Sequence, residues 1–302
     1  MFSAGKSIAA IVTSLMVDRG FMEYEEKVCT YWPEFGQNGK DKITVADVLR
    51  HEAGLAHIKD ALNIYDILRD NIKDNAIGQM IEKCEPYFPT NNFNSDGTVS
   101  QRSYHSVSRG WILNELVRRV CPEGRTIGEI LRQDVNIEGV HCGLNDREMK
   151  IAVGFKFVSP LWVLAQSLLP ERFGRKIDYG VWDFIKKGIA HGIVSLRLHD
   201  LVRHISNLRI MSKPQFEKKS RQFYIFDPFI YGTDTFVRGE NPGASCNGSA
   251  RGMSRLASTM ANKGVTPEGE MLITDKTWEK MHGEEKMVKD GILGRCYYYS
   301  VR

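Results

Sequence analysis

Hydrophobic residues recur at helical spacing in many stretches of the chain. Near the amino terminus this spacing predicts a helix over residues 3–19, which Gly20 ends. The apolar face of that helix consists of Ile8, Ile11, Val12, Leu15 and Met16. The same spacing and end signals predict further helices over residues 44–49, 58–84, 106–120, 126–131, 252–262 and 274–281. Thr44 and Thr274 are the expected caps of the helices that they precede.

Strand signals are scarce. Residues 296–301 are rich in tyrosine and are the one convincing strand prediction. Residues 85–97 hold two prolines, three asparagines and a glycine and predict a loop, and Asn241-Pro242-Gly243 predicts a turn. Residues 151–231 are aromatic and basic without a clear period. The pattern favours either an all-α protein or a mixed fold that lacks part of its sheet.

Composition describes an ordinary globular chain. It has 302 residues, 42% of them hydrophobic, which is enough for one large core or two small ones. The net charge of +4 gives little reason to expect a nucleic-acid partner, and none is predicted. None of the six cysteines forms a Cys-x-x-Cys pair, so we expect no metal site, no dense disulfide framework and free thiols.

The amino-terminal sequence predicts no targeting signal. The first residues lack the basic, apolar and small-residue pattern of a signal peptide, and an intracellular protein is the default expectation. Residues 151–170 are apolar but contain Lys156 and Pro160. A spanning helix needs about 20 mostly apolar residues, so this stretch predicts a buried or surface-dipping segment, with membrane contact as the alternative.

A serine and a lysine stand three residues apart where the first helix begins. Ser3 and Lys6 would share a helix face, close to unpaired backbone N–H groups. Lysine in such a positive environment loses part of its preference for the charged form and can accept a proton from a serine. The spacing by itself is common, and Ala4-Gly5-Lys6-Ser7 also matches the end of a P-loop. That alternative needs a preceding strand and a further glycine, which the chain does not show.

Longer segments carry a family resemblance. They are Phe2 to Ile8, Val17 to Phe21, Tyr31-Trp32-Pro33-Glu34-Phe35, Asn38-Gly39-Lys40 and Ile43 to Leu55, followed by Tyr104 to Val120, Gly124 to Leu131 and Asn247 to Gly264. Together they resemble the β-lactamase-related serine hydrolases, which include class C β-lactamases, penicillin-binding proteins and carboxylesterases. The Trp-Pro-Glu-Phe segment is most similar to the esterase-like and animal β-lactamase-like branch. Residues 151–240 match poorly.

The resemblance implies a fold and a site. The fold is α+β, an antiparallel sheet flanked by helices beside a helical lobe. Ser3 becomes the nucleophile, Lys6 its proton-relay partner, and Tyr104 a phenol that deprotonates Ser3 and later protonates the leaving group. Ser106 takes the position of a substrate-binding residue. His51 and His105 look structural. No cofactor is implied, and the substrate is a small-molecule or peptide-like ester or amide.

The chain also departs from the family pattern. The third motif, a Lys/His-x-Gly element on a late strand, is missing after Gly294, and only two residues precede Ser3. We therefore expect one incomplete domain, truncated at both ends, with residues 1–57 and 240–302 on the sheet side and 58–239 in the helical lobe. The alternative to a working hydrolase is an impaired family member that acts as a scaffold or self-associates. The oligomeric state stays open.

Overall fold

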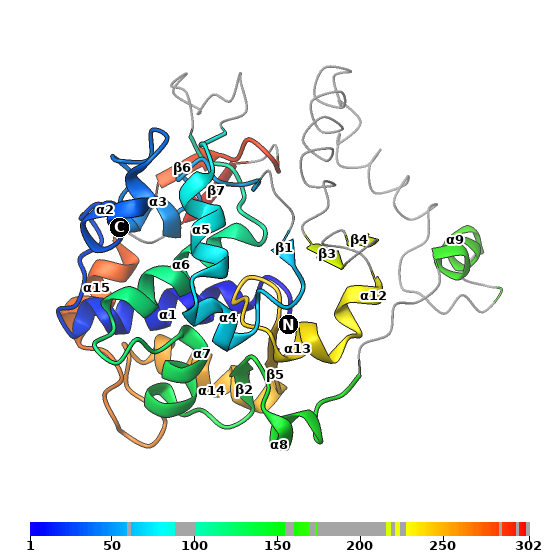
Figure 1. Ribbon diagram of the computed structural model, residues 1–302. Coiled ribbons are helices and arrows are strands. Elements are labelled where there is room, and N and C mark those ends of the chain that lie inside the picture. Colours follow the sequence, from blue (N-terminus) through cyan, green and yellow to red (C-terminus); the bar gives the residue numbers. More distant parts are fainter. Residues whose placement is uncertain are drawn as a thin grey trace. The chain divides into compact units, whose positions relative to one another are not determined.

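A computed structural model describes the greater part of the chain (Figure 1). The described residues are 1–58, 62–87, 101–154, 160–169, 173, 216–218, 221–223, 228–283, 286–293 and 296–299. The chain divides into two compact units, Met1–Val153 together with Asn207–Arg302, and Gly154–Ser206. The expected division into a sheet side and a helical lobe stays a prediction.

Helices are the main regular structure in the described part of the first unit. They are α1 (Gly5–Asp18), α2 (Val28–Tyr31), η1 (Pro33–Gly36), α3 (Val45–Leu49), α4 (Arg69–Lys73), α5 (Ala76–Lys83), α6 (Ser108–Val120), α7 (Ile127–Ile130), a π-helical turn η2 (Leu131–Val135), α8 (Asp146–Met149), α12 (Pro228–Tyr231), α13 (Asp234–Arg238), α14 (Ala250–Ala261) and α15 (Asp275–His282). The second unit contains α9 (Pro160–Leu168). Among the described residues no helix is both long and apolar enough to cross a membrane.

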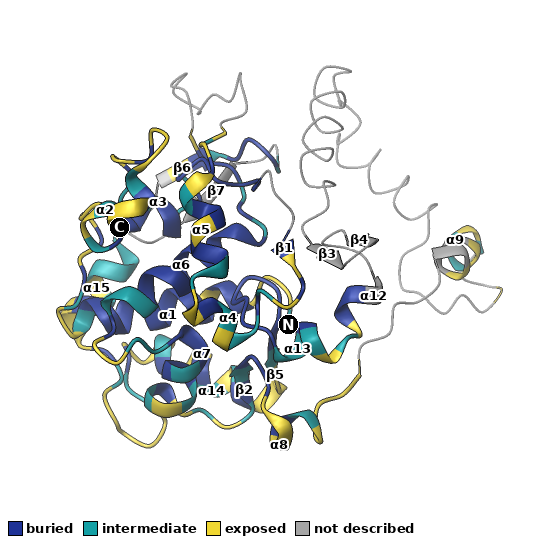
Figure 2. Cartoon of the chain, viewed as in Figure 1, coloured by how far each residue is buried: buried dark blue, intermediate teal, exposed yellow. Residues whose placement is uncertain are grey.

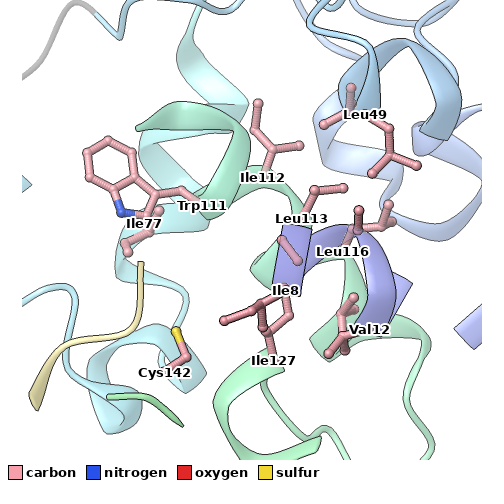
Figure 3. Close-up of a cluster of buried hydrophobic side chains, with 14 of the residues drawn as sticks. Ile8, Val12, Leu49, Ile77, Trp111, Ile112, Leu113, Leu116, Ile127 and Cys142 are labelled. Carbon is pink, nitrogen blue, oxygen red and sulfur yellow. The ribbon is translucent and has the colours of Figure 1, made fainter. Parts of the chain in front are cut away.

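Helix α1 forms the centre of the core (Figure 2). All its residues from Gly5 to Val17 are buried except Ser7. A helix that is apolar on every side must be covered on every side, and α6, α7 and α15 all pack against this one. In Figure 3, Ile8 and Val12 of α1 lie close to Leu116 of α6. This packing fixes the position of the first turn of α1, which carries Lys6.

Within the described residues, the strands are short and form three small sheets. Strand β1 (Leu62–Asn63) pairs in parallel with β3 (Phe216–Lys218), which pairs antiparallel with β4 (Arg221–Phe223). Strands β2 (Val140–Cys142) and β5 (Cys246–Gly248) form an antiparallel pair, as do β6 (Lys286–Lys289) and β7 (Cys296–Tyr299). The prediction of a strand at residues 296–301 is confirmed by β7 over residues 296–299, and residues 300–301 lie outside the described residues. The prediction of a single strand is wrong, because segments of two to four residues are too short to show an alternating pattern.

Most predicted helices are present, with ends shifted by one or two residues. Thr44 caps α3 through a reciprocal pair of hydrogen bonds with Asp47, and the Thr274 hydroxyl accepts from the backbone N–H of Thr277 to cap α15. The prediction of helices over residues 58–84 is confirmed only for the second half of that range. Helices α4 and α5 occupy its second half, whereas β1 and a turn occupy residues 62–68. The side chain of Asp66 closes that turn by accepting from the backbone N–H of Asn63.

Candidate active site

The beginning of α1 places Ser3 and Lys6 on one side of the same turn. The backbone N–H of Lys6 donates to the carbonyl of Ser3, one turn earlier, at 3.0 Å. Gly5 between them is buried, and a Cβ there would lie 2.2 Å from the carbonyl oxygen of Pro242. Glycine is therefore required for the close approach of this turn to the loop at residues 241–245.

Tyr104 completes a three-residue cluster. Its hydroxyl lies 2.5 Å from the Oγ of Ser3, although the two residues are 101 positions apart in the sequence. The Nζ of Lys6 is 3.3 Å from the same Oγ and 4.9 Å from the centre of the Tyr104 ring. The structure thus brings together the three residues for which the sequence predicts catalytic roles.

Backbone carbonyls hold the amine of Lys6 in place. Its Nζ donates to the carbonyl of Ser106 at 2.6 Å and to that of Gly243 at 3.2 Å. Two N–H groups of a neutral amine satisfy these two carbonyls, and its lone pair is then left for the hydroxyl of Ser3. The arrangement suits an amine that accepts a proton from the serine.

The surroundings favour the neutral form of both partners of Ser3. Burial, helped by the nearby Arg109 cation, lowers the pKa of Lys6 to about 7. Burial also raises the pKa of Tyr104 above that of an ordinary phenol, although the hydrogen bond with Ser3 opposes that shift. Near neutral pH the site therefore holds a phenol and a partly deprotonated amine. A phenolate at Tyr104 is disfavoured, because its pKa is raised.

Ser106 lies beside the cluster and takes part through its backbone. Its carbonyl is the shorter of the two backbone contacts of Lys6. The side chain is half-buried. A substrate-binding role for that side chain stays a prediction.

His51 and His105 support the loops around the cluster. The Nδ1 of His51 accepts the backbone N–H of His105 at 2.9 Å, and the Nε2 of His105 accepts that of Leu55 at 2.9 Å. The lone pair of each neutral ring is thereby occupied. Burial lowers the pKa of His51 well below its usual value and that of His105 to about 3. Neither ring is placed to act as a base toward Ser3.

Arg109 is a residue of the site that sequence reasoning missed. It is 5% exposed, and its guanidinium donates to the carbonyl of Lys6 at 3.0 Å and to that of Leu49 at 3.1 Å. A signal was present in the sequence, because Arg109 falls on the same helical face as Leu113 and Leu116, where a charge is out of place. Gly243 was also missed, since a carbonyl contact has no sequence signature.

A cavity of about 280 Å³ opens onto the cluster. It is lined by Ser3, Lys6, Ser7, Ala10, Leu49, His51, Tyr104 and Arg109. The described residues contain no group of three or more His, Cys, Asp or Glu side chains placed to hold a metal ion. The reactive groups of the cluster at this cavity are the hydroxyls of Ser3 and Tyr104 and the amine of Lys6.

Two sequence comparisons identify relatives of this chain. Residues 1–140 match the Beta-lactamase family model. The chain is 32% identical over 171 residues to esterase/beta-lactamase LipL of Mycobacterium tuberculosis (strain ATCC 25618 / H37Rv). Over the matched residues, the chain is similar to the β-lactamase-related serine hydrolases. The match with LipL covers 56% of this chain and 36% of that relative.

Solved structures show the fold of this chain. A family VIII carboxylesterase superposes with a TM-score of 0.64 at 24% identity, over 99% of this chain and 65% of the other. EstA from Arthrobacter nitroguajacolicus Rue61a gives 0.66 at 21% identity, over 100% and 66%. A penicillin-binding protein homolog from Caulobacter crescentus gives 0.62 at 23%, over 99% and 65%. The β-lactamase-like α+β fold is confirmed, and the chain spans about two thirds of the length of these structures.

Proposed function

We propose that this chain is a serine hydrolase that cleaves an ester or amide through an acyl-enzyme on Ser3. The observation that carries the proposal is the position of the Ser3 Oγ, 2.5 Å from the hydroxyl of Tyr104 and 3.3 Å from the amine of Lys6. The sequence similarity to an esterase/beta-lactamase supports ester or amide hydrolysis as the class of reaction. The activity, substrate and partners of the whole protein are part of the proposal.

Lys6 is the proton acceptor in the first step. Ser3 Oγ attacks the carbonyl carbon of the substrate, and its proton passes to the lone pair of Lys6, directly or through the hydroxyl of Tyr104. A pKa of about 7 leaves a large fraction of the Lys6 amine neutral at physiological pH. Tyr104, kept as a phenol, accepts the serine proton while it donates its own.

Tyr104 also suits the departure of the leaving group. The tetrahedral intermediate collapses to an acyl-Ser3 ester, and the leaving oxygen or nitrogen takes a proton from Tyr104, which Lys6 replaces. A water molecule then attacks the acyl ester and gives a proton to the same pair, which returns a proton to the Ser3 Oγ as it leaves, so that free Ser3 and a carboxylic acid result. Each step passes one proton through the pair of Tyr104 and Lys6.

Covalent labelling tests the proposal. A fluorophosphonate probe is incubated with the purified chain, and the modified peptide is identified by mass spectrometry. We expect one adduct, on Ser3, and its loss in Ser3→Ala. Ser254→Ala is the matched control, because Ser254 is an exposed helical serine outside the cavity. Its labelling should equal that of the wild type.

Two results would contradict the proposal. One is the absence of a Ser3 adduct in wild-type protein whose circular dichroism shows it folded. The other is equal labelling in Ser3→Ala. Either would favour the non-catalytic alternative, and a defined oligomer in light scattering would then support a scaffold. Panels of p-nitrophenyl esters of increasing acyl length and of β-lactams separate the substrate classes once Ser3 is labelled.

A further inference from the structure

Two buried cysteines face each other across the β2–β5 pair. Cys142 and Cys246 are direct partners in its register, and they are 0% and 1% exposed. Their thiols are hydrogen-bonded to each other, which together with burial raises the pKa of Cys142 well above its usual value. In the reduced protein both are free thiols.

The backbone hydrogen bonds between β2 and β5 show whether Cys142 and Cys246 are a hydrogen-bonded or a non-hydrogen-bonded pair. The backbone N–H of Ser249 donates to the carbonyl of Gly139 at 2.8 Å, next to the Val140–Gly248 partners. Hydrogen-bonded positions alternate along an antiparallel pair, so His141 and Asn247 exchange hydrogen bonds and the two cysteines do not. Cα atoms of such non-hydrogen-bonded partners are about 4.5 Å apart and their side chains approach closely. That separation lies at the short end of the range of about 4.4–6.8 Å usual for disulfides.

We propose that Cys142 and Cys246 form a redox-modifiable dithiol site that closes to an intramolecular disulfide. With glutathione disulfide as the oxidant, one cysteine thiolate attacks a glutathione sulfur and releases the first glutathione. The second cysteine thiolate then attacks the mixed disulfide and releases the second glutathione. The protein pair loses two protons and two electrons, and the oxidant becomes two glutathione thiols. Because the pair is buried and the pKa of Cys142 is raised well above its usual value, closure is slow.

The site adjoins the first turn of α1. The Sγ of Cys246 would lie 3.0 Å from a Cβ placed on Gly5, and Cys246 directly follows the loop whose Gly243 carbonyl holds Lys6. The disulfide would therefore fasten β5, with this loop, to β2. The dithiol itself does not depend on whether Ser3 is a nucleophile.

Peptide mapping tests the inference. Reduced protein is equilibrated with glutathione buffers of increasing oxidising strength, free thiols are blocked with N-ethylmaleimide under denaturing conditions, and tryptic peptides are analysed without reduction. Trypsin leaves Cys142 in residues 133–147 and Cys246 in residues 239–251, each as the only cysteine of its peptide. We expect the two peptides joined, in a fraction that follows the ratio of oxidised glutathione to the square of reduced glutathione.

Cys142→Ala and Cys246→Ala should each abolish the joined peptide, and Cys29→Ala, at a half-exposed position outside the pair, should leave it unchanged. A glutathione adduct that stays on either cysteine, without a joined peptide, would overturn the inference. So would N-ethylmaleimide on both cysteines in the most oxidising buffer, in protein left native and in protein refolded in that buffer. Because the readout is a covalent link and not turnover, its failure is separate from failure of the proposed hydrolase.

Discussion

Acidification is expected to switch off acylation at Ser3, because it protonates Lys6. Burial and the Arg109 cation bring the pKa of this amine from 10.5 to about 7. At pH 7 about half of the Lys6 amines are then neutral, against about three in ten thousand for an ordinary lysine. The structure therefore supplies about 10³-fold more proton acceptor than an exposed lysine would at this pH.

The assay is the initial rate of fluorophosphonate labelling, or of ester hydrolysis where an ester is turned over, between about pH 5 and pH 9. We expect the rate to fall about tenfold per unit of pH below a midpoint near 7, since only the neutral amine accepts the proton. Lys6→Arg should lose at least about 10²-fold at every pH in this range, because a guanidinium stays charged. Lys42→Arg, at an exposed position, is the matched control and should keep the wild-type profile.

Two outcomes would refute this reasoning. A wild-type rate that is level from about pH 5 to pH 9 would show that no group with a pKa near 7 controls the reaction. A Lys6→Arg variant with the wild-type rate would show that the amine is not the proton acceptor. A midpoint near 7 that disappears in Lys6→Arg supports the assignment.

The remaining predictions concern the surroundings of the cluster. Arg109→Met removes the cation that lowers the pKa of Lys6, so it should move the acid midpoint of labelling to higher pH. Arg109→Lys should bring the midpoint part of the way back. Identical midpoints in the two variants would contradict the electrostatic role of Arg109. Gly5→Ala should lower the free energy of unfolding by about 1–3 kcal/mol in urea titrations, because its Cβ meets the carbonyl of Pro242, although alanine favours helix. Gly154→Ala, in open space, should change little, and equal stability of both variants would argue against the clash. The unfolding free energy should also fall as the pH drops from about 6.5 toward about 3, because the unfolded chain binds a proton at the position of His105 that the folded chain excludes. His105→Phe should flatten that pH dependence, and an unchanged slope would refute the contribution.

Much of the helical content could be predicted from local signals. The caps at Thr44 and Thr274 act within one turn, and Gly20 marks the end of the first helix in the same local way. The apolar residues of α1 announce a buried helix because their spacing depends only on helical geometry. Most of the strands were missed because they are too short to show an alternating pattern. Some of them also exist only because a distant segment supplies their hydrogen bonds, as Cys246–Gly248 does for Val140–Cys142.

The sequence by itself determined the spacing of Ser3 and Lys6, since a helix places residues three apart on one face wherever it forms. The segments quoted above also carry the resemblance to the β-lactamase-related serine hydrolases, which the match of residues 1–140 to the Beta-lactamase family model supports. Only the tertiary structure decided that Tyr104 reaches Ser3 and that the carbonyls of Ser106 and Gly243 hold Lys6. The tertiary structure also decided the pKa of Lys6, because burial and the nearness of a cation come from packing between segments distant in sequence.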